Sequence, residues 1–304
     1  MSKSLKISVL AMTVAASVGV MQPASADVLA TSVIELNNLL FSHSGGAVLN
    51  AGTDFSSLSY TNTGAEAVTF TGTSNFNTSG SNTPLDLPLH CNGSGCATSG
   101  LTPNGFQHLG TVTGNFAAAD QNELGFPIAG LGSPLGATVS SAAYGQIQPP
   151  PPAIGNANSN NGLTAQIVFA PTFTGAVDIS ANFDYFWKVF LSAGEKAGAF
   201  AHSSGVVSFG LVDLSTGANV FTFVPAGLNW DFSLNGPAPV NLTLTDTNSG
   251  TFVFTTPTLT AGDLYQLTAR EVTLAEVTSV PEPATLALFG ISLLGLTVLR
   301  RRFV

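Results

Sequence analysis

The chain has two cysteines, Cys91 and Cys96, and the segment between them contains Gly93 and Gly95. Glycines let a short loop close, and disulfide bonds persist in exported proteins. A structural zinc site needs about four ligands. His90 would add one ligand to the two cysteines, and the chain has no second cysteine pair. The pattern predicts a small disulfide loop, no metal site and no cofactor.

The histidines lie in segments rich in Gly, Ser and Asn, with no spacing typical of metal ligands. His202 precedes Ser203 and Ser204, but sequence neighbours do not define a catalytic triad, and no nucleophile elbow is present. The acidic residues are scattered, so no carboxylate pair suited to glycoside hydrolysis is recognisable. We therefore expect no catalytic residue; a secreted hydrolase is the weakest of three hypotheses.

Aromatic residues offer another kind of site, because their faces stack on sugar rings. The aromatics between 179 and 191 share a face with aliphatic residues, so we expect them in the core. Trp230 lies beside Asn229 and Asp231 in a loop-like segment. Trp230 is therefore the expected exposed aromatic and the candidate ligand platform.

Period-two alternation of apolar and polar residues predicts many short strands, separated by Gly, Asn, Ser and Pro. Strands are expected at 31–41, 47–50, 67–70, 179–191, 206–214, 220–224, 240–245, 251–255 and 264–274, with turns at 215–217, 246–250 and 260–263. Helix signals are almost absent between 27 and 279. The fold class expected is all-β, an antiparallel β-sandwich resembling a jelly roll.

The segment from about 71 to 162 lacks this alternation. It contains four prolines at 149–152, expected to be polyproline II, and an Asn-rich run at 156–161, expected to be flexible. Either 27–145 and 163–279 are two domains, or 27–279 is one sandwich with long loops. We prefer one domain, because the first half has too few predicted strands to bury a core.

Charge excludes one class of function. Only 8% of the chain is charged, and between 27 and 279 three basic and sixteen acidic residues leave a formal charge of −13. Such a body is repelled by phosphates, so nucleic-acid binding is not expected. The acidic residues leave calcium binding open.

The N-terminus has the three parts of a secretory signal peptide over 1–26. Two lysines precede an apolar stretch from 7 to 20, and Ala24-Ser25-Ala26 offers small residues to a signal peptidase. Cleavage after Ala26 makes Asp27 the first mature residue.

The C-terminal segment 280–304 has three ordered parts. Val280, Pro281, Glu282 and Pro283 form an extended stretch, because proline disfavours helix. An apolar run from 284 to 299 rises about 24 Å as a transmembrane helix, short against a hydrocarbon core of about 30 Å. Arg300, Arg301 and Arg302 form a cytoplasmic membrane stop, which leaves the body on the outer side.

These three parts resemble the PEP-CTERM sorting tail. The resemblance implies that an exosortase, a membrane protease-transpeptidase of Gram-negative bacteria, recognises Pro281 to Pro283. The protein would pass through an inner-membrane intermediate and reach the cell surface or extracellular matrix. A plain C-terminal membrane anchor is the alternative.

The leading hypothesis is a non-enzymatic, exosortase-dependent surface or matrix protein, deployed with extracellular polysaccharide. The second is a carbohydrate-binding module that uses Trp230 or the aromatic strand. The expected partners are the exosortase, signal peptidase, the inner membrane transiently and extracellular polysaccharide. Oligomeric state is left open.

Overall fold

The computed structural model describes residues 27–110, 112–148 and 155–280, and within them it has thirteen strands and no helix. In order they are β1 (Val28–His43), β2 (Phe55–Phe70), β3 (Thr73–Ser81), β4 (Asp86–Asn92), β5 (Phe116–Leu124), β6 (Ala137–Ile147), β7 (Gly155–Pro171), β8 (Val177–Leu191), β9 (Phe200–Asp213), β10 (Ala218–Phe223), β11 (Trp230–Asn235), β12 (Leu242–Thr255) and β13 (Tyr265–Ser279). The all-β prediction is confirmed. No membrane-spanning helix is found in these ranges; the predicted signal and transmembrane helices lie outside them.

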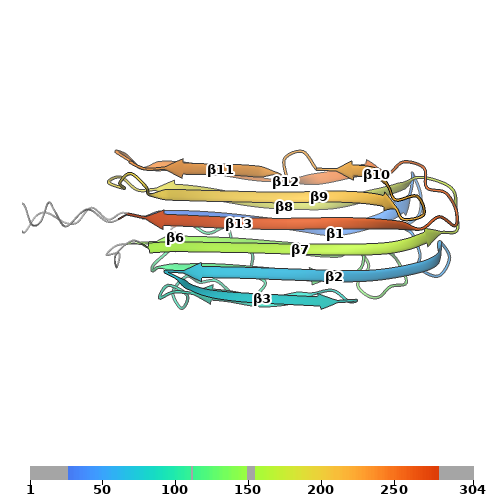
Figure 1. The fold of residues 1–304 in the computed structure, drawn as a ribbon, viewed down its shortest axis with the longest axis horizontal. Coiled ribbons are helices and arrows are strands. Elements are labelled where there is room, and N and C mark those ends of the chain that lie inside the picture. The colour runs from blue at the N-terminus through green and yellow to red at the C-terminus, as the bar shows by residue number, and fades with distance from the viewer. Residues whose placement is uncertain (1–26, 111, 149–154, 281–304) are drawn as a thin grey trace, which may run out of the picture.

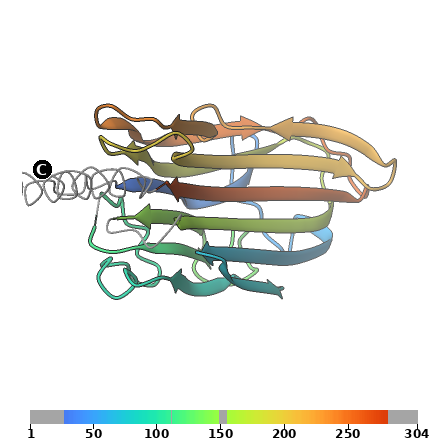
Figure 2. The same cartoon turned by 60° about the vertical axis from the view of Figure 1, so that its left-hand side comes forward.

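The strands form two antiparallel sheets stacked as layers (Figure 1). The first sheet has the order β12-β8-β1-β6-β5-β4, and the second has the order β10-β9-β13-β7-β2-β3, with β11 paired to β9. In Figure 2 the strands of both layers run in similar directions, as in an aligned sandwich. Both halves of the chain contribute to both sheets, which together are wider than a jelly roll of about eight strands.

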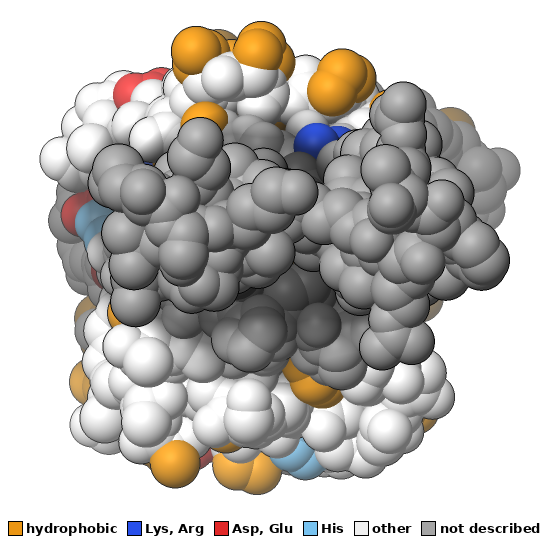
Figure 3. All heavy atoms as spheres, turned by 90° about the vertical axis from the view of Figure 1, so that its left-hand side faces the viewer, with side chains coloured by type: hydrophobic (Ala, Val, Ile, Leu, Met, Phe, Trp, Pro, Cys, Tyr) orange, Lys and Arg blue, Asp and Glu red, His pale blue; other side chains and the backbone are white. Residues whose placement is uncertain are grey.

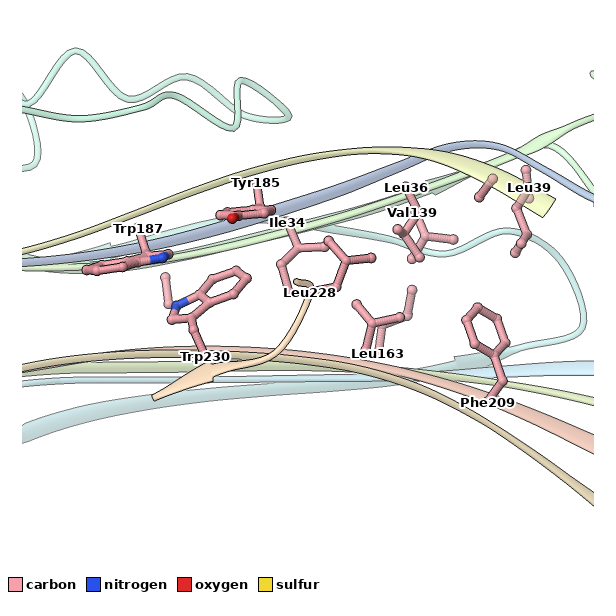
Figure 4. Packing of buried hydrophobic residues seen from close by; sticks show 14 of the residues in the cluster. Ile34, Leu36, Leu39, Val139, Leu163, Tyr185, Trp187, Phe209, Leu228 and Trp230 are labelled. Carbon is pink, nitrogen blue, oxygen red and sulfur yellow. The ribbon is translucent and has the colours of Figure 1, made fainter. Parts of the chain in front are cut away.

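The core between the sheets is built from alternating side chains. In β8, Ile179, Tyr185 and Trp187 point inward, as the alternation predicts. Figure 4 shows residues of the two layers facing one another, with Ile34 on one side and Leu163 on the other. Burial of this apolar surface, at about 25 cal/mol per Å², is the main stabilising contribution.

The expectation of long loops from about 71 to 162 is wrong, because β3 to β7 occupy much of that range. The Asn-rich run at 156–161 lies in β7, which pairs with β13 on one side and β2 on the other. Asn156, Asn158 and Asn160 point outward while Ala157, Ser159 and Asn161 are buried, and both backbone edges are hydrogen-bonded. Pairing with two long neighbours therefore outweighs the weak strand preference of asparagine.

The turn predicted at 246–250 is also wrong. Strand β12 is continuous and pairs with β8 from Leu242 to Thr255. Its outward row is polar apart from one valine and comprises Thr243, Thr245, Thr247, Ser249, Thr251, Val253 and Thr255. The outward residues of β8 that lie beside this row include Phe186 and Lys188. The row of threonines therefore does not continue onto the neighbouring strand. Polar residues that resembled a turn instead form the solvent-facing row of an edge strand.

The first sheet is covered on its outer face by the chain between β4 and β5. Phe106 and Leu109 from this segment pack with Phe116 and Tyr144 in a second apolar cluster. Strand β6 is consequently buried on both faces over nearly its whole length. The second sheet has no such cover among the described residues, and its outer face is open.

Candidate functional site

The outer face of the second sheet carries a shallow groove of about 510 Å³ across β3, β2, β7 and β13. Figure 1 looks onto this face, with the four strands side by side. Strand register arranges the lining in three rows: Phe76, Ala67 and Asn160; Thr78, Ala65, Gly162 and Val272; and Gly80, Thr63, Thr164 and Arg270.

The groove is hollow because its middle is lined by small residues. Ala65, Ala67 and Gly162 form the floor, and a Cβ added at Gly162 would meet only the Val272 side chain, at 3.8 Å. Phe76 stands at one corner and is 69% exposed, the most exposed large hydrophobic residue among those described. An open aromatic ring beside hydroxyl and amide groups is suited to sugar rings.

Arg270 stands at the opposite corner of the groove. Its side chain is exposed and forms no ion pair or hydrogen bond with another described residue. The groove lining contains no aspartate or glutamate. Its one charge is therefore an available guanidinium, which binds planar anions in a forked geometry.

Sequence reasoning missed this groove, because its residues come from strands that are distant along the chain. The one local signal is the run of small residues in β2 and β7 at alternate, outward positions. Without the pairing of β3 to β2 and of β7 to β13, those residues do not define a common surface.

Acidic and amide side chains also lie inside the sandwich, in what we call the interior polar band. The band consists of Asn62, Glu66, Gln121, Glu123, Ser141, Ser159, Asn161, Glu271 and Thr273, each almost fully buried. Glu66, Asn161 and Thr273 are cross-strand neighbours in the second sheet. Gly64 leaves room for the band, because a Cβ there would lie 1.9 Å from the Gln121 Nε2.

Burial keeps the acids of the band protonated to higher pH. It raises the pKa of Glu66 to about 9, with smaller contributions from the charges of Asp120 and Asp86. Burial likewise raises the pKa of Glu123 to about 7, although the Tyr60 hydroxyl donates a hydrogen bond to its carboxylate. The pKa of Glu271 lies well above its ordinary value for the same reason. The three acids of the band therefore keep their protons to higher pH than exposed carboxylates do.

The band lies between the sheets, away from any surface that a polymer can reach. A cavity of about 30 Å³ beside Glu123 and Glu271 is otherwise lined mainly by apolar core residues. Within the described ranges, no three His, Cys, Asp or Glu side chains are grouped to hold a metal ion. The acids of the band therefore belong to the core, and the groove is the better candidate for ligand binding.

Trp230 is not exposed, so its assignment as a ligand platform is corrected. It is the first residue of β11, points between the sheets and is only 7% exposed (Figure 4). Its ring centroid lies 5.2 Å from that of Tyr185, and its Nε1 donates to Ser203 Oγ at 3.2 Å. The polar neighbours Asn229 and Asp231 mark the start of an alternating strand, which the sequence did not distinguish from a loop.

Cys91 and Cys96 form a disulfide bond, with 5.7 Å between their Cα atoms. Cys91 belongs to β4, and the bond closes the start of the segment that covers the first sheet. The disulfide bond therefore stabilises the covering segment.

His90, the residue before Cys91, makes no hydrogen bond to Glu66, because its Nδ1 lies 3.7 Å from the Glu66 carboxylate.

His202 is held between two carboxylates on the outer face of the second sheet. Its Nδ1 lies 3.0 Å from Glu276 Oε2, and its Nε2 lies 2.8 Å from Asp231 Oδ1. The Ser203 hydroxyl points the other way and donates to the Thr31 carbonyl at 2.8 Å. With both ring nitrogens engaged, His202 is not placed to accept a proton from serine.

The first and last described residues of the body leave from the same end of the sandwich. The Asp27 backbone N–H donates to Ser192 Oγ at 2.6 Å, and the Glu195 carboxylate contacts Ser279 Oγ at 3.4 Å and the Val280 amide. The segment 192–195 therefore holds both ends. Figure 3 views this end, where most described surface is neither apolar nor charged.

Several predicted site residues lie outside the described ranges. They are Ala24 and Ala26 of the signal-cleavage site, Pro281, Glu282 and Pro283 of the sorting motif, and Arg300, Arg301 and Arg302.

The described part of the chain is thus an all-β sandwich whose last strand, β13, ends at Ser279. Residues 279–302 match the model of the PEP-CTERM protein-sorting motif. The chain is therefore a protein with a PEP-CTERM sorting domain, which marks it for exosortase processing and export to the cell surface. No curated protein and no solved structure matches it.

Proposed function

We propose that this protein is a non-enzymatic component of the bacterial surface or extracellular matrix, exported by a cleavable signal and released from its membrane tail by an exosortase. The sorting motif at 279–302 carries the proposal. The proximity of Asp27 and Val280 supports it, because signal and tail then approach the membrane from one end of the body. A Gram-negative host follows from the exosortase.

The positions of the reactive side chains support a non-enzymatic role. Glu66 and Glu271, whose pKa values are raised by burial, lie between the sheets, and both nitrogens of His202 are engaged by carboxylates. The open surface of the second sheet presents hydroxyls, amides, Phe76 and Arg270. These groups bind ligands but offer no acid-base pair.

Removal of the sorting motif should trap the protein in the inner membrane. In an exosortase-containing host, wild type should be recovered outside the inner membrane, with an intact mass that begins at Asp27 and lacks the arginines. A variant with Pro281, Glu282 and Pro283 all changed to alanine should keep residues 284–304 and fractionate with the inner membrane. An exosortase-deficient host is the control. Wild-type protein that keeps its tail in the inner membrane of the competent host would favour a plain anchor.

The second candidate function is binding of extracellular polysaccharide in the groove of the second sheet. The observation in its favour is the exposed ring of Phe76, which lies beside a groove floor of small residues and a border of hydroxyl and amide groups. The groove crosses four neighbouring strands on the open outer face of the sheet, so an extended polymer can lie along it.

Phe76→Ala should weaken binding to a polysaccharide at least about tenfold, because the stacking surface is lost. Gly162→Val should have a similar effect by filling the floor; its position tolerates a side chain, since nothing lies within 3.8 Å of its Cβ. Affinity electrophoresis in gels containing polysaccharide measures both. Val253→Ala is the matched control, because Val253 is 64% exposed but lies on β12 in the other sheet. Unchanged mobility of both groove variants would contradict binding at this site.

A further inference from the structure

Arg270 gives the groove a chemical preference. On the four strands that form the groove, Arg270 and Glu276 are the charged residues that point outward. Glu276 is six residues further along β13, about 20 Å away, and is engaged by His202. The one charge in the groove lining is therefore positive, although the body as a whole is acidic.

The acidity of the body is also smaller than its sequence suggests. Glu66 is protonated near neutral pH, because burial raises its pKa to about 9, and burial raises the pKa of Glu271 as well. The remaining acids lie outside the groove lining. At physiological salt the Debye length is about 8 Å, so distant surface charges are largely screened at Arg270.

The spacing of the two corner residues suits a polymer. Phe76 and Arg270 lie three strands apart and two rows apart, which corresponds to a diagonal of about 20 Å. A single sugar ring cannot reach both. An extended chain can stack one ring on Phe76 and bring an acidic group of a later sugar to Arg270.

We propose that the groove binds an acidic polysaccharide, with one ring on Phe76 and a sugar carboxylate paired to the Arg270 guanidinium. This proposal rests on polysaccharide binding in the groove. The guanidinium donates two parallel hydrogen bonds to a carboxylate, which a neutral sugar does not accept in the same way. Because the pair is exposed, its loss should weaken binding only about five- to tenfold.

The test compares polygalacturonate with its fully methyl-esterified form, which has the same backbone without the charge. The mature protein is measured at 0.15 M salt, a screening condition, with a chelator present so that calcium cannot bridge carboxylates. Wild type should bind polygalacturonate about five- to tenfold more tightly than the ester. Arg270→Gln should abolish this preference, Arg270→Lys should retain part of it, and Phe76→Ala should weaken binding to both polymers.

The outcomes separate the two proposals. If wild type binds the ester or a neutral glucan as tightly as polygalacturonate, or if Arg270→Gln keeps the preference, the acidic ligand class is wrong while groove binding stands. If wild type binds none of these polymers, or if Phe76→Ala and Gly162→Val change nothing, polysaccharide binding in the groove fails as well.

Discussion

Glu66→Gln should raise the free energy of unfolding at pH 8 by about 3 kcal/mol and leave it nearly unchanged at pH 4. Glu66 is fully buried, and burial together with the charges of Asp120 and Asp86 raises its pKa from 4.5 to about 9. Above pH 4.5 the unfolded chain releases this proton, whereas the folded protein retains it until about pH 9. The contribution of Glu66 to stability is therefore complete below pH 4.5 and is lost as pH rises.

The full linkage amounts to about 1.4 kcal/mol for each pH unit between the two pKa values. We expect less than the full amount, because local relaxation and water entry stabilise a buried charge. Glu123, whose pKa is raised to about 7, should contribute a similar loss between pH 4.5 and 7. The protein should accordingly be more stable at pH 5 than at pH 8.

Urea unfolding followed by tryptophan fluorescence at pH 4, 6 and 8 measures this effect. Asp263→Asn is the control, because the Asp263 carboxylate lies in the turn before β13 and forms no ion pair or hydrogen bond with another described residue, so its replacement should change stability by about 0.5 kcal/mol or less. A Glu66→Gln variant that is destabilised equally at pH 4 and pH 8 would mean that Glu66 contributes through hydrogen bonding rather than through its proton.

Trp230→Ala should lower the free energy of unfolding by about 3–5 kcal/mol, because it removes a large buried side chain. The indole packs against Tyr185 and donates to Ser203. It also lies directly over Gly205, where a Cβ would come within 2.3 Å of the ring. Gly205→Ala should therefore destabilise the protein through the same contact.

Thermal and urea unfolding of the Trp230→Ala and Phe76→Ala variants distinguish a structural role in the core from a ligand-binding role at the surface. Phe76 is exposed, so its replacement should cost about 1 kcal/mol or less while weakening ligand binding. If Trp230→Ala instead left stability unchanged and abolished polysaccharide binding, Trp230 would be a ligand platform after all.

The elements that could be predicted from the sequence are those whose alternation is strong. In 179–191 seven apolar residues occupy one face, and this segment is the strand β8. The hairpin of β9 and β10 was also predictable, because Ser215, Thr216 and Gly217 separate two alternating runs.

The elements that could not be predicted are those whose strand conformation depends on pairing with neighbouring strands. The asparagines of β7 have low strand preference, yet two long neighbours hydrogen-bond to that segment along its length. The sequence in the middle of β12 resembles a turn, because the polar residues of this edge strand face solvent. Local propensity contains neither kind of information.

The sequence was sufficient for the class of fold and for the sorting motif, because alternation and the Pro-Glu-Pro segment are local patterns. The interior polar band, the burial of Trp230 and the groove between Phe76 and Arg270 required the tertiary structure. Each depends on which strands are neighbours and which face is covered. Strand neighbours and covered faces depend on contacts between residues far apart in the chain, and these contacts cannot be predicted from local patterns in a single sequence.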